Sequence, residues 1–192
     1  LLIFYDENEP ERAKEIALEI TNSQAVAVLG HYTSAVSIAT APIYQEYGIP
    51  AISGSATADE LTKGNDWYFR SIFNNSEQGA LLANYARKIL HYHYVDIIFD
   101  EDIYGTTLAK SFIKTAEFIG LKIRHRWHFK EDGTDFQTIL EEMTATLLQD
   151  SPTRKNMIFF ATHSTEAVDA IVTLRKKGVS KNVKFIGGDA LS

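Results

Sequence analysis

The sequence predicts an α/β fold made of two Rossmann-like lobes, each a mostly parallel sheet flanked by helices. Three observations predict it. Short, β-rich apolar runs recur along the chain, and longer stretches with helical spacing lie between them. The first three runs start at evenly spaced positions, 1, 25 and 49, before this spacing breaks. Because strand–helix–strand alternation implies right-handed crossovers, the strands within each lobe should be parallel.

The expected strands are runs of apolar and β-branched residues. They cover residues 1–5, 25–29, 49–53, 94–99, 121–129, 157–161 and 183–186. A further extended segment is expected at residues 68–72. None of these runs approaches the roughly 18 apolar residues that a membrane-spanning helix needs.

The expected helices carry apolar residues three and four positions apart. Four such stripes cover residues 13–20, 108–119, 136–147 and 168–174. Pro10 is a start signal for the first stripe, and Gly120 stands where the second should end. The basic run after Leu174 is expected to be a solvated helix end. Another helix should follow Ser34, and a short polar one should lie at residues 58–62.

The regular pattern breaks across residues 56–76, which predicts a crossing between two lobes near residues 72–75. We expect the first lobe to span residues 1–72 and the second to span residues 73–192. Ligands of open α/β sheets bind beyond the carboxyl ends of the strands, and two adjacent lobes form a cleft there. The residues that follow each strand are therefore the candidate site.

Composition excludes several classes of protein. The chain has 192 residues, is 45% hydrophobic, carries a formal net charge of −6 and has no Cys. This apolar content argues against disorder, and the acidic balance argues against broad nucleic-acid binding. Without Cys there are no disulfides, thiolate metal sites or Cys nucleophiles. The glycine-rich nucleotide motifs, G-x-S-x-G and H-E-x-x-H are absent, so we expect no cofactor and no metal.

Two strand-end loops of the first lobe are rich in hydroxyl groups. Residues 30–34 lead into a helix, with Thr33 or Ser34 as the N-cap, and residues 53–57 include Ser55, Ala56 and Thr57. Each loop alone is typical of a simple cap or turn. Together, hydroxyl groups and a helix N-terminus could hold a carboxylate.

The second lobe places different chemistry at its strand ends. Asp100-Glu101-Asp102 is expected to be a solvated turn rather than a metal site, because cation loops need ligands at more widely spaced positions. Tyr104 offers a ring and a hydroxyl to a ligand. His163 could be a general base, but no Ser or Asp partner stands in a recognisable arrangement around it. Asp189 follows two glycines and presents either a turn carboxylate or a ligand-binding one.

The ordered set of these features resembles the type I periplasmic binding proteins, specifically the branched-chain amino-acid (Leu/Ile/Val) receptors of ABC transporters. The residues that carry the resemblance are Gly30-His31 with Ser34, Ile49-Pro50, Ile52-Ser53 with Ala56-Thr57, Glu60-Leu61-Thr62, Phe69-Arg70, Asp100 with Tyr104-Gly105, Asp135-Phe136 and Gly187-Gly188-Asp189. They run in the family's order over nearly the whole chain.

The resemblance implies a function and a set of site residues. It implies a non-enzymatic module that closes its lobes around a small ligand, an amino acid, in the periplasm or outside the cell, free or membrane-anchored. Ser34 and the loop of Ser55, Ala56 and Thr57 would hold the α-carboxylate. Tyr104 would cover the ligand, and Asp189 would bind its α-ammonium. An ABC permease or a receptor signalling partner would recognise the closed form.

The sequence also departs from the family pattern. His163 stands where an aromatic residue commonly contacts the ligand, and Ser55 is bulkier than the usual Ala. The family's first strand and helix would precede Leu1, and its returning segments would follow Ser192, so the fold is expected to be incomplete at both ends. Three alternatives stay open: the ligand-sensing domain of a receptor kinase, the effector domain of a transcription regulator, and an enzyme that uses His163.

Overall fold

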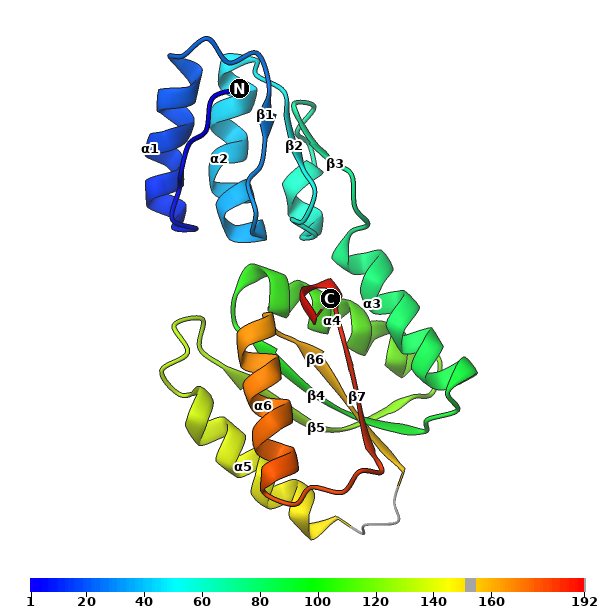
Figure 1. Cartoon of the computed structure of the whole chain (residues 1–192). Helices are drawn as coiled ribbons and strands as arrows, with labels where there is room; N and C mark the ends of the chain where they lie inside the picture. Colours follow the sequence, from blue (N-terminus) through cyan, green and yellow to red (C-terminus); the bar gives the residue numbers. More distant parts are fainter. Residues whose placement is uncertain (151–154, 192) are drawn as a thin grey trace. The chain divides into compact units, whose positions relative to one another are not determined.

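The computed structural model describes residues 1–150 and 155–191 and divides the chain into two compact units (Figure 1). Unit 1 is Leu1–Asn75 and unit 2 is Ser76–Ser192. The sequence predicted a boundary between residues 72 and 73, whereas the structure divides the chain where helix α3 (Asn75–Asn84) begins. Among the described residues, no helix combines the length and the apolar character needed to cross a lipid bilayer.

Unit 1 is a parallel sheet with helices on one face. Its elements in chain order are α1 (Pro10–Thr21), β1 (Val28–Leu29), α2 (Ser34–Tyr47), β2 (Ala51–Ser53), the 3-10 turn η1 (Asp59–Thr62) and β3 (Tyr68–Arg70). The strands are ordered β1-β2-β3, and each neighbouring pair is parallel. This pairing confirms the α/β class that the sequence predicts for the first lobe.

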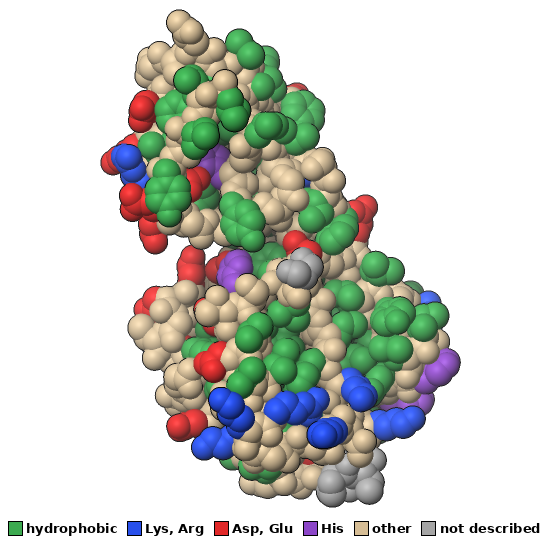
Figure 2. Space-filling view, in the orientation of Figure 1, with side chains coloured by type: hydrophobic (Ala, Val, Ile, Leu, Met, Phe, Trp, Pro, Cys, Tyr) green, Lys and Arg blue, Asp and Glu red, His purple; other side chains and the backbone are tan. Residues whose placement is uncertain are grey.

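The sheet of unit 1 is covered on one side. Val28, Ala51 and Tyr68 are paired across the three strands and are buried against α1 and α2. Successive strand residues point to opposite faces, so the next residue of each strand faces the other way. These next residues are also register partners and are exposed: Leu29, Ile52 and Phe69. Figure 2 shows hydrophobic side chains at the surface of this unit.

Unit 2 contains a parallel sheet with helices on both faces. Its elements are α3, the π-helical turn η2 (Tyr85–Ile89), β4 (Tyr94–Asp100), α4 (Ile103–Phe118), β5 (Lys122–Phe129), α5 (Phe136–Gln149), β6 (Asn156–Ala161), α6 (Ser164–Lys176), β7 (Val183–Gly187) and the 3-10 turn η3 (Asp189–Leu191). The strands are ordered β5-β4-β6-β7, and every pair is parallel. All carboxyl ends of these strands therefore lie at one edge.

The central strands of unit 2 are buried on both faces. Ile98 and Phe160 pack with α5 and α6 on one side of the sheet, while Ile97 and Phe159 pack with α4 on the other. The ring of Phe159 stacks on that of Phe112 in α4 with centroids 4.0 Å apart. Since strands buried on both faces have continuous apolar sequences, they were the clearest strands in the sequence.

The predicted strand at residues 1–5 is wrong. These residues form no strand, and the side chains of Leu1 and Ile3 are exposed. An apolar run that buries little area cannot offset the entropy of ordering it in a sheet. The segment is held instead by Asp6, whose carboxylate lies 2.5 Å from Nδ1 of the buried His31.

Helix α3 was not predicted from the sequence, which indicated a crossing between two lobes near residues 72–75. The helix begins within that segment, at Asn75. Its apolar residues form one contiguous run, Ala80 to Ala83, rather than a stripe, so helical periodicity is not visible. This omission matters because the first turn of α3 carries a residue of the candidate site.

The basic end of α6 is more than a solvated helix end. Lys and Arg side chains gather over the end of α6 and the start of β7 (Figure 2). Arg175 donates hydrogen bonds to the carbonyl oxygens of Ser180 and Val183, both at 2.6 Å, and its guanidinium lies over the ring of Phe185. It therefore fixes the turn between α6 and β7, at the amino end of that strand and away from the strand-end site.

Candidate functional site

The two strand-end loops of unit 1 are bonded to each other. The hydroxyl of Ser53 donates to the carbonyl oxygen of His31 at 2.7 Å, and the hydroxyl of Ser55 donates to that of Tyr32 at 2.5 Å. The backbone N–H of Ala58 donates to the hydroxyl oxygen of Ser34 at 3.1 Å. The structure thus brings together the loops that follow β1 and β2, as expected for the ends of neighbouring parallel strands.

Arg70 stabilises the loop that follows β2. Its guanidinium donates to the carbonyl oxygens of Ala56, at 3.3 Å, and Ala58, at 2.8 Å. Ala56 and Thr57 are fully or almost fully buried, and the backbone N–H of Ala56 donates to the hydroxyl of Ser53. Burial and these hydrogen bonds therefore fix the backbone conformation of residues 56–58.

Thr57 and Ser34 are the hydroxyl groups of unit 1 that suit an anionic ligand best. Both side chains are buried, at 0% and 2% exposed. The Thr57 hydroxyl has no hydrogen-bond partner among the described residues, and a buried hydroxyl without a partner is destabilising. The Ser55 hydroxyl differs, because it already donates to Tyr32.

The carboxylate of Asp189 lies at the carboxyl end of β7, held by two donors of unit 2. The amide nitrogen of Gln78, in the first turn of α3, donates to Asp189 Oδ1 at 2.7 Å. The hydroxyl of Tyr104 donates to the same oxygen at 3.0 Å. Burial raises the pKa of the Tyr104 hydroxyl, and the Asp189 carboxylate raises it further, so this phenol stays protonated as a donor. Tyr104 and Asp189 are thus neighbours.

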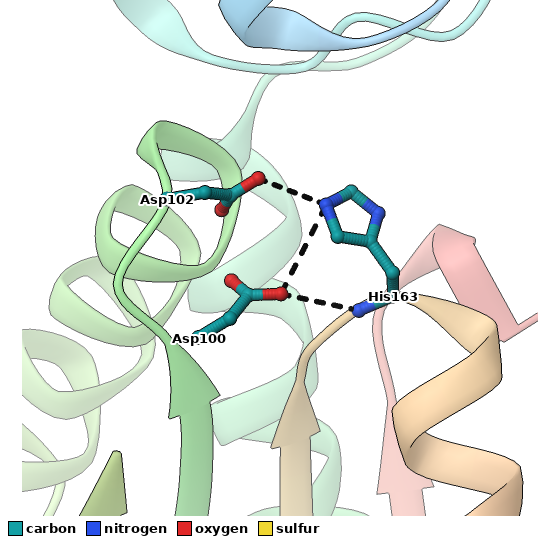
Figure 3. Close-up of side chains that lie close together, drawn as sticks. All are labelled: Asp100, Asp102 and His163. Atoms are coloured by element: carbon teal, nitrogen blue, oxygen red, sulfur yellow. Dashed lines mark hydrogen bonds and ion pairs between the residues drawn. The ribbon is translucent and has the colours of Figure 1, made fainter. Parts of the chain in front are cut away.

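His163 stands in a cluster that the sequence did not reveal (Figure 3). Its Nε2 lies 2.8 Å from Asp102 Oδ2 and 3.9 Å from Asp100 Oδ2, and its backbone N–H donates to Asp100. Its ring also packs against that of Tyr104, with centroids 5.2 Å apart. The expectation that no Asp partner surrounds His163 was wrong, because parallel strands β4 and β6 end side by side and bring residues 61 and 63 positions apart together.

The acidic turn after β4 is also not the solvated turn that we expected. Asp100 and Asp102 are only 3% and 9% exposed, whereas Glu101 is exposed. Asp102 is the N-cap of α4 and accepts the backbone N–H of Gly105 at 2.6 Å. A helix N-terminus stabilises a buried carboxylate, and for this reason Asp102 is buried without a large cost.

Protonation balances the charges of this cluster. Burial raises the pKa of the Asp100 carboxyl to about 8, and the neighbouring Asp102 acts in the same direction. Burial alone would raise the pKa of Asp102, but hydrogen bonds from His163 and Gly105 lower it below the usual value. The hydrogen bond to Asp102 raises the pKa of His163 to about 8. Near pH 7 the cluster is therefore a neutral Asp100 beside an Asp102–His163 ion pair.

Among the described residues, the side chains of Asp100, Asp102 and His163 also lie close enough together to hold a metal ion. Their ligand atoms all lie within 4.8 Å of one another. Two carboxylate oxygens and one imidazole nitrogen suit Zn²⁺ or Mn²⁺. The two protons already neutralise the cluster, so its stability does not require a cation.

We expect the His163 ring to titrate near pH 8, and the substitution D102N to move this midpoint toward the ordinary value of about 6.5. Asn is also a good N-cap, so α4 should persist in this variant. The proton is held more tightly in the folded than in the unfolded state. His163 therefore contributes full stability below about pH 6.5 and loses it as the pH rises through about 8. An NMR titration of the histidine ring protons measures the midpoint.

The control for this titration is E101Q. Glu101 pairs with the exposed His128 at 2.7 Å and stands one residue from Asp102, so E101Q removes the same charge from the neighbouring position. The midpoint of His163 should stay unchanged in E101Q. A midpoint that moves equally in both variants would mean that the general field, rather than the hydrogen bond to Asp102, sets the pKa.

The chain matches, over residues 1–192, the family described as receptor family ligand binding region. The chain belongs to this family. The match covers both units and confirms the resemblance that the sequence motifs indicated. Sequence reasoning missed Gln78, to which the resemblance did not point, and also missed Asp100 and Asp102 as partners of His163.

Curated relatives in the family are named as amino-acid-binding proteins. One, the "Amino acid binding protein" of Pseudomonas aeruginosa, is 25% identical over 188 residues, which are 97% of this chain and 48% of the relative. The Leu/Ile/Val-binding protein of Escherichia coli is 30% identical over 112 residues, 57% of this chain and 30% of the relative. This chain spans about half the length of the two relatives that align with nearly all of its residues.

Solved structures of the family share the fold. The branched-chain amino acid transporter substrate binding protein of Streptococcus pneumoniae, in complex with isoleucine, is 29% identical with a TM-score of 0.84, and the match covers 98% of this chain and 51% of that one. An ABC transporter substrate-binding protein of Desulfitobacterium hafniense, in complex with Leu, is 27% identical with a TM-score of 0.78, covering 99% and 55%. The type I periplasmic binding protein fold is thereby confirmed.

Proposed function

We propose that this chain binds a free amino acid, as part of a solute-binding protein that serves an ABC transporter. The observation that carries the proposal is the Asp189 carboxylate at the end of β7, held by Gln78 and Tyr104. A carboxylate fixed by two donors at a strand end is suited to bind an ammonium group, because a charged hydrogen bond is about twice as strong as a neutral one.

The α-carboxylate of the ligand would be bound by unit 1. Ser34 and Thr57 place hydroxyl groups after β1 and β2, and α2 begins at Ser34, so its free N–H groups also favour an anion. Ser55 and Ala56 belong to the same loop, and Ala56, which is almost fully buried with both backbone groups bonded, would shape the loop that presents Thr57. Neutral hydroxyl groups and a helix N-terminus thus suit the carboxylate of a zwitterion, and the Asp189 carboxylate suits its ammonium group.

We further propose that Tyr104 and His163 contact the remainder of the ligand. The two rings pack against each other beside Asp189. The family resemblance implies an aromatic residue at position 163; His163 instead offers a polar edge, which would favour a ligand side chain with a hydrogen-bonding group. The relatives are named binding proteins, and we propose that this chain likewise binds its ligand without converting it.

Location and partners follow from the same family. One solved neighbour is titled a periplasmic binding protein and others are titled ABC transporter substrate-binding proteins. We propose that this protein acts in the periplasm or outside the cell and delivers its ligand to a permease. Ligand-induced closure about the segment near residue 75 would create the form that the permease recognises.

A thermal-shift screen of the full-length protein against the common amino acids, small carboxylates and amines tests this function. At about 100 times its dissociation constant, a ligand stabilises by about 2.7 kcal/mol, and each kcal/mol raises Tm by about 2–4 °C in a protein of 150–250 residues and by less in a longer one. We expect amino acids to raise Tm and their deaminated analogues to do so much less. Stabilisation only by acids that lack an amine would contradict the amino-acid assignment, and turnover of a ligand would contradict the binding role.

A further inference from the structure

Gln78 occupies an unusual place for a glutamine. It is only 5% exposed, in the first turn of α3, and its amide nitrogen donates to Asp189 Oδ1 at 2.7 Å across 111 residues of sequence. The Tyr104 hydroxyl donates to that same oxygen at 3.0 Å. One carboxylate oxygen thus receives two hydrogen bonds from different helices, which fixes the plane and direction of the Asp189 carboxylate.

The other half of the Gln78 amide does not stabilise the fold. Its Oε1 is buried and has no hydrogen-bond partner among the residues that the structure describes. A buried carbonyl without a partner is destabilising, and an apolar side chain of similar size would avoid this cost. The useful polar group of Gln78 at this position is the amide N–H, which donates to Asp189.

Gly188 leaves room for the side chains of both donors, Gln78 and Tyr104. A Cβ atom at this position would lie 2.5 Å from the Tyr104 hydroxyl and 2.6 Å from Gln78 Oε1. These are distances that real Cβ atoms do not show, so the two side chains occupy the space that any larger residue at position 188 would need. Tightly packed side chains cannot turn to another rotamer at low cost. The Asp189 carboxylate is therefore oriented before any ligand arrives.

We propose that Gln78 is a positioning residue that, together with Tyr104, orients the Asp189 carboxylate to bind a primary ammonium group. This inference rests on the proposed amino-acid-binding function and adds the residue that sets the preference for an amine. Gln78 acts through Asp189 rather than on the ligand, because its own free oxygen is buried. Its loss should remove selectivity for the amine while leaving the fold intact.

The test compares two ligands in the wild type and in Q78M. Met has nearly the shape of Gln without its polar atoms. The ligands are the amino acid that stabilises the full-length protein most in the screen and its analogue without the amine, which for leucine is 4-methylpentanoate. Isothermal titration calorimetry gives both dissociation constants, and a thermal scan without ligand gives Tm. We expect Q78M to weaken the amino acid by about 10-fold or more. Binding of the deaminated analogue should change less than about 2-fold.

Stability separates positioning from a merely structural role. Q78M removes an unpartnered buried oxygen, which is stabilising, and also the hydrogen bond to Asp189. The Asp189 carboxylate is only partly buried and can bind water instead, so the Tm of Q78M without ligand should stay close to that of the wild type. The matched control is Q137M, which removes the amide of another glutamine, the exposed Gln137, that donates to a carboxylate, that of Asp169, at 2.9 Å. Q137M should bind both ligands like the wild type.

The outcomes separate this inference from the function on which it rests. If the wild type does not prefer the amino acid to its deaminated analogue, the proposed function fails, and this inference fails with it. If the wild type has that preference and Q78M retains it, only the role of Gln78 is overturned. Equal weakening of both ligands together with a lower Tm would make Gln78 a packing residue and would likewise overturn the proposal.

Discussion

Replacing Asp189 with Ala is expected to weaken binding of an amino acid by about 10- to 150-fold. A hydrogen bond to a charged group contributes about 1.5–3 kcal/mol, and the substitution would also leave the Gln78 amide and the Tyr104 hydroxyl without their shared acceptor. The effect should be confined to ligands that carry an amine. Titration calorimetry with an amino acid and with its deaminated analogue measures both affinities in the full-length protein.

D169A is the matched control for this experiment. Asp169 also accepts a hydrogen bond from a glutamine, Gln137, but this pair lies on the exposed surface of α5 and α6. D169A should leave both affinities unchanged. If D189A weakens the deaminated analogue as much as the amino acid, Asp189 shapes the site without binding the ammonium group, and the proposed orientation of the ligand is wrong.

Replacing Gly105 with Ala should destabilise unit 2 by about 3 kcal/mol or more. A Cβ at this position would lie 1.8 Å from Asp100 Oδ1 and 2.6 Å from the carbonyl oxygens of Asp100 and Ala161. Two of these atoms are backbone, so the start of α4 must move away from the ends of β4 and β6. Overpacking typically costs about 1–3 kcal/mol, and a backbone clash lies at or above the upper limit. Urea denaturation measures the change in unfolding free energy.

Gly120→Ala distinguishes this steric effect from the general cost of losing a glycine. Gly120 has a φ of +72°, so Ala there is strained by about 1–2 kcal/mol, but its Cβ would meet no atom within 4 Å. We expect G105A to be clearly the more destabilising of the two. Equal or smaller destabilisation by G105A would mean that α4 can shift freely, and that the packing at the end of β4 does not fix Asp102 and Tyr104.

Much of unit 2 could be predicted because its central strands, β4 and β6, are buried on both faces. The run at residues 157–161 is continuous and apolar, and the structure has β6 at Asn156–Ala161. The strands of unit 1 were harder to delimit, since β1 is only Val28–Leu29 within a longer apolar run. For such short strands the neighbouring chain decides which residues pair, and local sequence does not contain that information.

The strand-end rule located most of the candidate site, because parallel strands bring their carboxyl ends to one edge. Asp189, Tyr104 and Ser34 are placed by this rule and by the family motifs. Gln78 follows no strand and lies in a helix with no visible stripe, so nothing in the sequence placed it beside Asp189. The hydrogen bond between Asp102 and His163 was hidden for a related reason, since adjacent strands in the sheet are not adjacent in the sequence.

The sequence by itself determined the α/β class, the parallel strands, most helix positions and the family, because periodicity and ordered motifs are local properties of a chain. Only the tertiary structure decided which side chains meet: Gln78 with Asp189, and Asp100 and Asp102 with His163. It also decided that Asp100 and Asp102 are buried rather than solvated, and hence that their pKa values move apart in opposite directions. Burial and charge pairing depend on residues that are distant in the sequence, and these residues become neighbours only when the crossover connections bring the parallel strands side by side.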